Sequence, residues 1–161
     1  MRTADQSPRR TGEQMTDAVL VTGAFGLVGT ATVKHLGAQG RHVVATDLDT
    51  PANRRSASTL PAGVRVHWAD LTDPEQVGAL LAATTPASVI HLAAVIPPLC
   101  YAKPALARAV NVNATANLVN TAAAQAHPPR FILASSIAVY GPRNPHRLSD
   151  VLTADTPVRP Y

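Results

Sequence analysis

The sequence has a single cysteine, few aromatic residues, few charges and no long apolar run. Cys100 can make no intramolecular disulfide and has no CxxC or Cys/His cluster around it, which argues against a disulfide scaffold and a zinc site. No stretch of about 18 apolar residues occurs, and the first residues carry too many charges for a secretory signal. We therefore expect a cytoplasmic chain without a membrane span, in which Cys100 is a small residue near a helix start.

Positive charge is present but scattered. The net charge is +4 and the pI about 9.8, values that would suit a nucleic-acid partner. The arginines, however, come singly or nearly so, and aromatic residues make up only 4% of the chain. Without a basic stripe or stacking side chains, we expect no nucleic acid to bind.

Composition divides the 161 residues into three parts. Residues 1–16 hold almost no apolar side chains and no periodicity, which predicts a disordered leader. In residues 17–141, β-branched runs alternate with alanine-rich segments, as in βαβ units. Residues 142–161 lie in a proline-rich stretch without periodicity, which predicts a loop.

Five apolar or β-branched runs predict strands, over residues 18–23, 42–47, 64–68, 88–94 and 130–136. One helix is expected to begin in a glycine-rich turn and to end among Gly37 and Gly40. A second begins at Pro74, with Asp73 as its N-cap and Gln76 at the capping-box position. A third covers about residues 103–126, where apolar residues recur every four positions at Leu106, Val110, Ala114, Leu118 and Ala122.

The turn between the first predicted strand and helix reads G-x-x-G-x-x-G at Gly23, Gly26 and Gly29. Glycines there let the backbone turn and approach a pyrophosphate, whose charge the helix amides and dipole bind. Asp47, 18 residues after Gly29, ends the second strand, where its carboxylate can accept hydrogen bonds from ribose hydroxyls. A plain tight turn and a strand-end turn residue are the alternatives. The carboxylate would repel a 2′-phosphate and so favours NAD over NADP, although Arg54 and Arg55 could offset it.

Five motifs in order resemble the extended short-chain dehydrogenase/reductase superfamily, the NAD-dependent epimerase/dehydratase group. They are "TGAFGLVG", "ADLTD", "HLAA", "NVNATANLV" and "SSIAVYG", which together span most of residues 18–141. The resemblance implies an α/β fold: a Rossmann-like doubly wound parallel sheet with strand order 3-2-1-4-5. It also implies that the small substrate domain of the family is absent from this chain. In that order the fifth strand is an exposed edge that invites self-association.

The resemblance also implies a cofactor site for NAD. Leu27 and Val28 would cover the pyrophosphate, Asp70 and Leu71 would border the adenine, and residues 92–94 would line the cofactor's path. Asp70 could instead cap a turn, and "HLAA" could simply end a buried strand, with His91 structural. The implied cofactor-binding set is Gly23, Phe25, Gly26, Leu27, Val28, Gly29, Asp47, Leu48, Asp70, Leu71, Leu92, Ala93 and Ala94.

Catalysis in this family uses a Ser/Thr, a Tyr and a Lys four residues after that Tyr, the lysine lowering the tyrosine's pKa for acid/base work. Ser136 matches the serine, with Ser135 the alternative, and Asn111 matches an asparagine that helps to seat a water near the lysine. Tyr161 is a candidate for the tyrosine, with a loop residue as the alternative.

The family lysine has no counterpart, because the chain contains only Lys34 and Lys103, and the motif places neither in that role. We therefore expect a fragment of an NAD(P)-dependent oxidoreductase, epimerase or dehydratase that is inactive alone. By analogy with the family, its expected substrate is a nucleotide sugar. The alternative is a noncatalytic dinucleotide-binding module or degenerate relative that acts through a partner.

Overall fold

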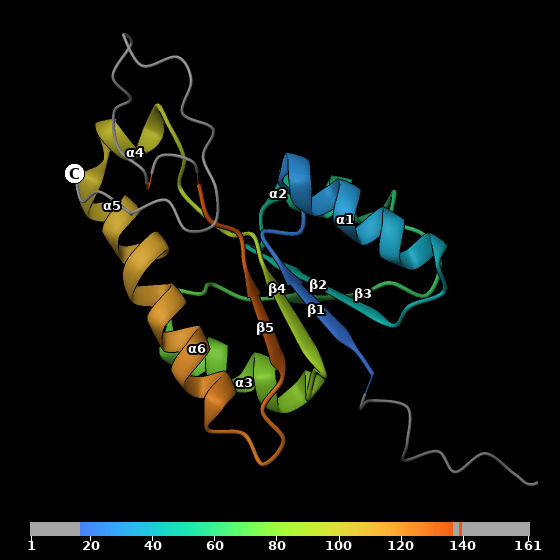
Figure 1. Ribbon diagram of the computed structural model, residues 1–161. Helices are drawn as coiled ribbons and strands as arrows, with labels where there is room; N and C mark the ends of the chain where they lie inside the picture. The colour runs from blue at the N-terminus through green and yellow to red at the C-terminus, as the bar shows by residue number, and fades with distance from the viewer. Residues whose placement is uncertain (1–16, 137–138, 140–161) are drawn as a thin grey trace, which may run out of the picture.

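A parallel five-stranded sheet forms the centre of the computed structural model, which describes residues 17–136 and 139 (Figure 1). Its strands lie in the order β3-β2-β1-β4-β5. Their bounds are β1 Val19–Thr22, β2 Val43–Asp47, β3 Arg65–Trp68, β4 Ser88–His91 and β5 Arg130–Leu133. The predicted Rossmann-like fold and strand order are confirmed, although each strand is shorter than the run that predicted it. The predicted leader and proline-rich loop lie outside the described residues.

Helices cover both faces of the sheet (Figure 1). Helix α1 (Leu27–Ala38) packs on the face that carries Val19, Val21 and Val43. Helices α3 (Pro74–Thr84) and α6 (Thr115–Ala123) pack on the opposite face, against Leu20, Val44 and Val89. Short segments complete the described chain: α2 Pro51–Ala57, α4 Leu99–Ala102, α5 Pro104–Arg108 and the π-helix η1 Ala109–Ala114. Burial on both faces explains why the central strands read as continuous apolar runs instead of alternating ones.

Helix α3 begins where its capping signal predicts. The Asp73 carboxylate accepts hydrogen bonds from the backbone N–H of Glu75 at 2.9 Å and of Gln76 at 3.4 Å. The Gln76 side chain does not reach back to the Asp73 N–H, as a capping box would. Its Nε2 instead donates to Asp73 Oδ2 at 2.8 Å, and its Oε1 accepts from the Asp70 N–H at 2.9 Å. The bonds to the Asp73 carboxylate lower its pKa, and the bond from the Gln76 side chain contributes most.

The helix predicted over residues 103–126 is divided into α5, η1 and α6. Of its predicted apolar track, Ala114, Leu118 and Ala122 are buried in the core, whereas Leu106 is 40% exposed. The N-terminal part of this segment therefore leaves the core and lies over the carboxyl ends of the strands, where it lines a cavity.

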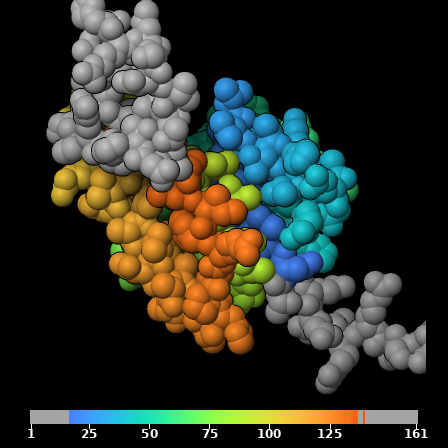
Figure 2. All heavy atoms as spheres, in the orientation of Figure 1, coloured from blue at the N-terminus to red at the C-terminus, as the bar shows by residue number. Residues whose placement is uncertain are grey.

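Strand β5 is an edge within the described residues, where it pairs only with β4. Ile132 is 47% and Leu133 54% exposed. Figure 2 shows the orange-red end of the described chain open at the surface, beside the orange helical segment. The predicted exposed edge is confirmed for this part of the chain. Within the described ranges no helix has the length and apolarity needed to cross a bilayer.

Candidate functional site

Two adjoining cavities lie at the carboxyl ends of the strands. The first cavity has a volume of about 480 Å³ and the second about 570 Å³, and residues 92–95, which follow β4, line both. The first cavity includes most of the predicted cofactor set: Gly23, Phe25, Gly26, Asp47, Leu48, Asp70, Leu71, Leu92, Ala93 and Ala94. Carboxyl ends of parallel strands are where ligands bind in open α/β sheets.

The three glycines of the turn after β1 have different surroundings. Gly23 has φ +63°, and a Cβ there would lie 2.7 Å from the Ala93 nitrogen. A Cβ on Gly29 would lie 2.0 Å from the Gly23 carbonyl oxygen, so α1 can approach the turn only with glycine at this position. Gly26 has φ −70°, and the nearest atom to its Cβ would be 3.4 Å away. Within the part of the chain that the structure describes, neither backbone conformation nor packing requires glycine at position 26, and the missing side chain leaves room for a ligand.

The start of α1 lacks a side-chain cap. Its N-cap is Gly26, and its first turn contains no acidic residue. The other two helices of the sheet's first half are capped, α2 by the Thr50 hydroxyl and α3 by Asp73. The first N–H groups of α1 therefore receive no side-chain cap, and together with the positive end of the helix dipole they can bind an anion. Leu27 and Val28 stand beside them, 93% and 62% exposed.

The Asp47 carboxylate lies on the glycine turn. Its Oδ2 accepts from the Phe25 N–H at 3.0 Å, and its Oδ1 accepts from the Leu48 N–H at 2.9 Å. A carboxylate has about four acceptor positions, so two remain for hydroxyl donors of a ligand. The structure thus brings together the two features that the sequence predicted to work jointly, the glycine turn and the carboxylate.

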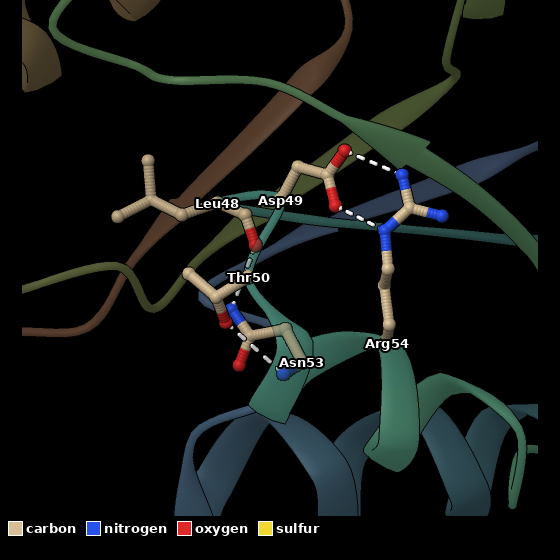
Figure 3. Close-up of polar contacts among 5 residues, drawn as sticks. All are labelled: Leu48, Asp49, Thr50, Asn53 and Arg54. Carbon is tan, nitrogen blue, oxygen red and sulfur yellow. Dashed lines mark hydrogen bonds and ion pairs between the residues drawn. The ribbon is translucent and has the colours of Figure 1, made fainter.

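In the segment after β2, the polar side chains form hydrogen bonds with one another and with the local backbone (Figure 3). Asn53 donates its N–H to the Thr50 hydroxyl at 3.1 Å and its Nδ2 to the Leu48 carbonyl at 2.8 Å. Arg54 donates from Nε and one terminal nitrogen to both oxygens of Asp49, at 2.5 and 2.6 Å. This pairing lowers the pKa of Asp49 and raises that of Arg54.

Arg54 is therefore held by a carboxylate that the sequence reasoning did not single out. Its guanidinium carbon also lies 5.7 Å from the centre of the Trp68 ring, which in turn lies 5.3 Å from that of Phe25. The spacing of Asp49 and Arg54, five residues apart across a helix start, was the available signal for this pair.

Asp70 both lines the first cavity and caps a turn. Its Oδ1 accepts from the Thr72 N–H at 2.9 Å and from the Thr72 hydroxyl at 2.7 Å. Leu71 follows it at the cavity wall and is buried. The turn-capping alternative is thus present without displacing Asp70 from the place that the resemblance implied.

The second cavity contains the candidate catalytic residues that the structure describes. Ser136, Ser135 and Asn111 line it, together with Cys100, which was expected near a helix start and is the second residue of α4. The Asn111 side chain is bonded to one residue: its Oδ1 accepts from the Val95 N–H at 2.7 Å, and its Nδ2 donates to the Val95 carbonyl at 2.9 Å. Its water-seating role stays a prediction, as do the roles of Ser136 and of Tyr161, which lies outside the described residues.

Comparison with known proteins places the chain in a family. The model of the NAD dependent epimerase/dehydratase family matches residues 19–161. The chain is 28% identical over 153 residues to UDP-glucose 4-epimerase of Mycoplasma genitalium, in a match that covers 89% of this chain and 43% of that protein. It is 31% identical over 153 residues to D-erythronate dehydrogenase of Cupriavidus necator, covering 88% of this chain and 44% of that protein.

Solved structures show the same likeness. UDP-glucose 4-epimerase of Thermus thermophilus, in complex with NAD, superposes with a TM-score of 0.77 at 29% identity, over 89% of this chain and 44% of that one. The enzyme WbmG of Bordetella bronchiseptica, in complex with NAD and UDP, gives a TM-score of 0.70 at 25% identity, over 89% of this chain and 44% of that one. The chain spans less than half the length of these relatives. It belongs to the NAD dependent epimerase/dehydratase family.

Proposed function

We propose that this chain is the NAD-binding part of an epimerase/dehydratase-type oxidoreductase that moves a hydride between NAD and a hydroxyl or carbonyl carbon of its substrate. One observation carries the proposal: the uncapped start of α1 and the Asp47 carboxylate meet at one cavity, joined by the 3.0 Å bond from the Phe25 N–H. An anion acceptor and a hydroxyl acceptor side by side suit a dinucleotide.

The described residues have separate roles in holding such a ligand. The diphosphate lies against the first amides of α1, and Gly26 leaves it room. Asp47 accepts hydrogen bonds from the adenosine ribose, while Leu48, Asp70 and Leu71 border the adenine. Residues 92–94 line both cavities, so they guide the nicotinamide end toward the second one.

NAD is favoured over NADP by the charges around Asp47. A 2′-phosphate on the ribose would lie against this carboxylate and be repelled. Arg54, one of the two arginines that could compensate, has two of its donors on Asp49 (Figure 3). Solved relatives are complexed with NAD, which agrees with this preference.

The second cavity is the proposed place of the chemistry. In this proposal Ser136 holds the reacting oxygen of the substrate, and Tyr161 takes or gives the hydroxyl proton. Asn111 fixes the backbone of Val95, which lines the second cavity. NAD, when bound, supplies the hydride acceptor. Relatives named for UDP-glucose and bound to UDP make a nucleotide sugar the proposed substrate class. Because Lys34 and Lys103 line neither of the two cavities, we expect this chain to bind the cofactor without turnover.

Calorimetric titration of the purified chain with NAD tests the proposal. We expect saturable 1:1 binding that weakens roughly tenfold or more in Asp47→Ala, because charge-assisted bonds to the ribose are lost. Asp17→Ala is the matched control, since it removes the same charge beside His42, away from both cavities, and should leave NAD binding unchanged. NADP should bind more weakly than NAD to the wild-type chain. No heat and no thermal shift with millimolar NAD would contradict the proposal.

A further inference from the structure

A chain of hydrogen-bonded polar side chains crosses from β1 to α6, buried at Thr22 and His91, and reaches the lining of the second cavity at His91 and Thr115. Thr22 and His91 lie in register on neighbouring strands β1 and β4, with exposed fractions of 0% and 2%. The Thr22 hydroxyl oxygen is 2.6 Å from His91 Nδ1, and His91 Nε2 is 2.8 Å from the Thr115 hydroxyl oxygen. Hydrogen-bonded polar groups this deep in a core have one low-energy arrangement of protons.

That arrangement follows from counting donors and acceptors. The Thr22 hydroxyl oxygen accepts from the backbone N–H of Leu92 at 3.2 Å and of Ala93 at 3.3 Å. The Leu92 N–H is shared with the Thr22 backbone carbonyl at 3.3 Å, whereas the Ala93 N–H bonds the hydroxyl oxygen. With both amides on its oxygen, the hydroxyl has its own hydrogen to donate to His91 Nδ1. This network assigns to His91 the neutral tautomer, in which Nε2 donates to Thr115.

The chain of bonds ends on the wall shared by both cavities. Leu92 and Ala93 line the first and the second cavity, and the Gly23 turn packs against the Ala93 backbone so closely that a Cβ on Gly23 would lie 2.7 Å from its nitrogen. The Thr22 hydroxyl thus fastens the end of β4 to the end of β1. The direction of that hydroxyl is set by His91.

We infer that His91 is a positioning residue of the dinucleotide site, which fixes the shared wall through Thr22 and does so only as the neutral Nε2–H tautomer. For its ligand the inference rests on the proposed NAD function. A proton on Nδ1 would face the Thr22 hydroxyl hydrogen, so that hydroxyl would have to turn. Its oxygen would then no longer be free to accept from both Leu92 and Ala93, and the wall would loosen in acid.

The surroundings keep the imidazole neutral. The Phe131 ring of β5 lies 6.0 Å from the imidazole centre, and Cys100 and Tyr101 of α4 are the titratable side chains that line the second cavity with it. Among the described residues no charged side chain perturbs His91, and burial alone lowers its pKa. An asparagine in its place could still present an acceptor oxygen to Thr22, whereas a leucine could not.

NAD titrations from neutral pH to well below the usual histidine range test the inference, because burial lowers the pKa of His91 in the folded chain. We expect wild-type affinity to fall toward the acid end, His91→Asn to bind within about threefold of wild type with a flatter pH profile, and His91→Leu to bind roughly tenfold more weakly at neutral pH. Circular dichroism checks that both variants fold. Equal weakening in both variants, or none in His91→Leu, would overturn the inference and leave His91 a packing residue.

Two ligand-free measurements on the full chain stand whether or not NAD binds. Nitrogen NMR shifts of the wild-type imidazole, assigned by their loss in His91→Asn, should show the proton on Nε2 at neutral pH. Amide hydrogen exchange at Leu92 and Ala93 should be faster in His91→Leu than in His91→Asn, while amides of α3 are unchanged. A proton on Nδ1, or equal exchange in the two variants, would overturn the inference. Failure of NAD to bind the wild-type chain would instead overturn the proposed function alone.

Discussion

Gly26 and Gly29 lie three residues apart in the same turn, yet a methyl group would have opposite effects at the two positions. In Gly29→Ala the new Cβ would lie 2.0 Å from the Gly23 carbonyl oxygen, so α1 must move and the fold should be strongly destabilised. In Gly26→Ala the nearest atom is 3.4 Å away, so the melting temperature should change little. The methyl group would, however, stand where the diphosphate approaches, and NAD affinity should fall roughly tenfold or more.

Thermal melts and NAD titrations of the two variants separate these effects. Gly78→Ala is the control for a methyl group in open space, because a Cβ at this position in α3 would meet no described atom within 4 Å apart from the neighbouring backbone of its own helix. It should raise stability by about 0.5–1 kcal/mol and leave NAD affinity unchanged. If the Gly26→Ala variant binds NAD as tightly as wild type, room for the diphosphate is not the reason for glycine at this position.

The motif residues were predictable because the local backbone geometry alone determines where each of them lies. Gly23, Gly26 and Asp47 stand at fixed distances from a strand end, and local geometry alone carries them to the first cavity. The partners of His91 were not predictable in the same way. Their bonds join side chains from different elements, such as β1, β4 and α6, whose separation is set by tertiary packing.

Among the elements, helix starts show the sequence signals most clearly. Thr50-Pro51 and Asp73-Pro74 each place a capping side chain before a proline at the first helical position, and each begins a helix. The second signal led to the prediction of α3, whereas α2 was missed although it carries the same signal. A helix of 7 residues has no apolar periodicity to draw attention to it.

The Asp73 cap makes a prediction about α3. Asp73→Ala should lower the melting temperature measurably, because the amides of Glu75 and Gln76 lose their acceptor, whereas Asp73→Asn keeps an acceptor oxygen and should lose less. Bonds to the charged form lower the pKa of Asp73, so the wild-type advantage is complete above about pH 4 and shrinks as the pH falls below it. Thermal melts of the three proteins at neutral and acid pH test this. An advantage over Asp73→Ala that grows in acid would contradict it.

The apolar track from Leu106 to Ala122 explains why one predicted helix became three segments. Steps of four residues turn about 40° too far on an α-helix of 3.6 residues per turn, so such a track winds off the face that packs on the sheet. The wider turns of η1 reduce this drift where Ala114 enters the core. Two consecutive residues of η1, Val110 and Asn111, line the first and the second cavity respectively. A count of apolar residues alone does not distinguish α-helical from π-helical turns.

For the whole molecule, the strand order could be predicted because the motifs resemble a family with a doubly wound parallel sheet, whose first strand lies between the second and the fourth. This order brings the ends of β1, β2 and β4 together, so residues 23, 47 and 92 line one cavity although they are far apart in sequence. The join between the cavities was not predictable, because it depends on how closely the backbones at Gly23 and Ala93 approach.

Stability of the whole molecule should fall as the pH drops below the usual histidine range. Burial lowers the pKa of His91 in the folded chain from its ordinary value of 6.5. In the window between the ordinary and the lowered value the unfolded chain binds a proton that the folded chain does not, so the free energy of unfolding decreases as the pH falls. Above that window the His91 contribution is constant. Urea denaturation of wild type and His91→Asn between about pH 5 and 8 isolates it, because asparagine does not titrate. We expect the wild-type curve to decline toward acid more steeply than that of the variant, and parallel curves would mean that the imidazole takes its proton as readily in the folded chain as in the unfolded one.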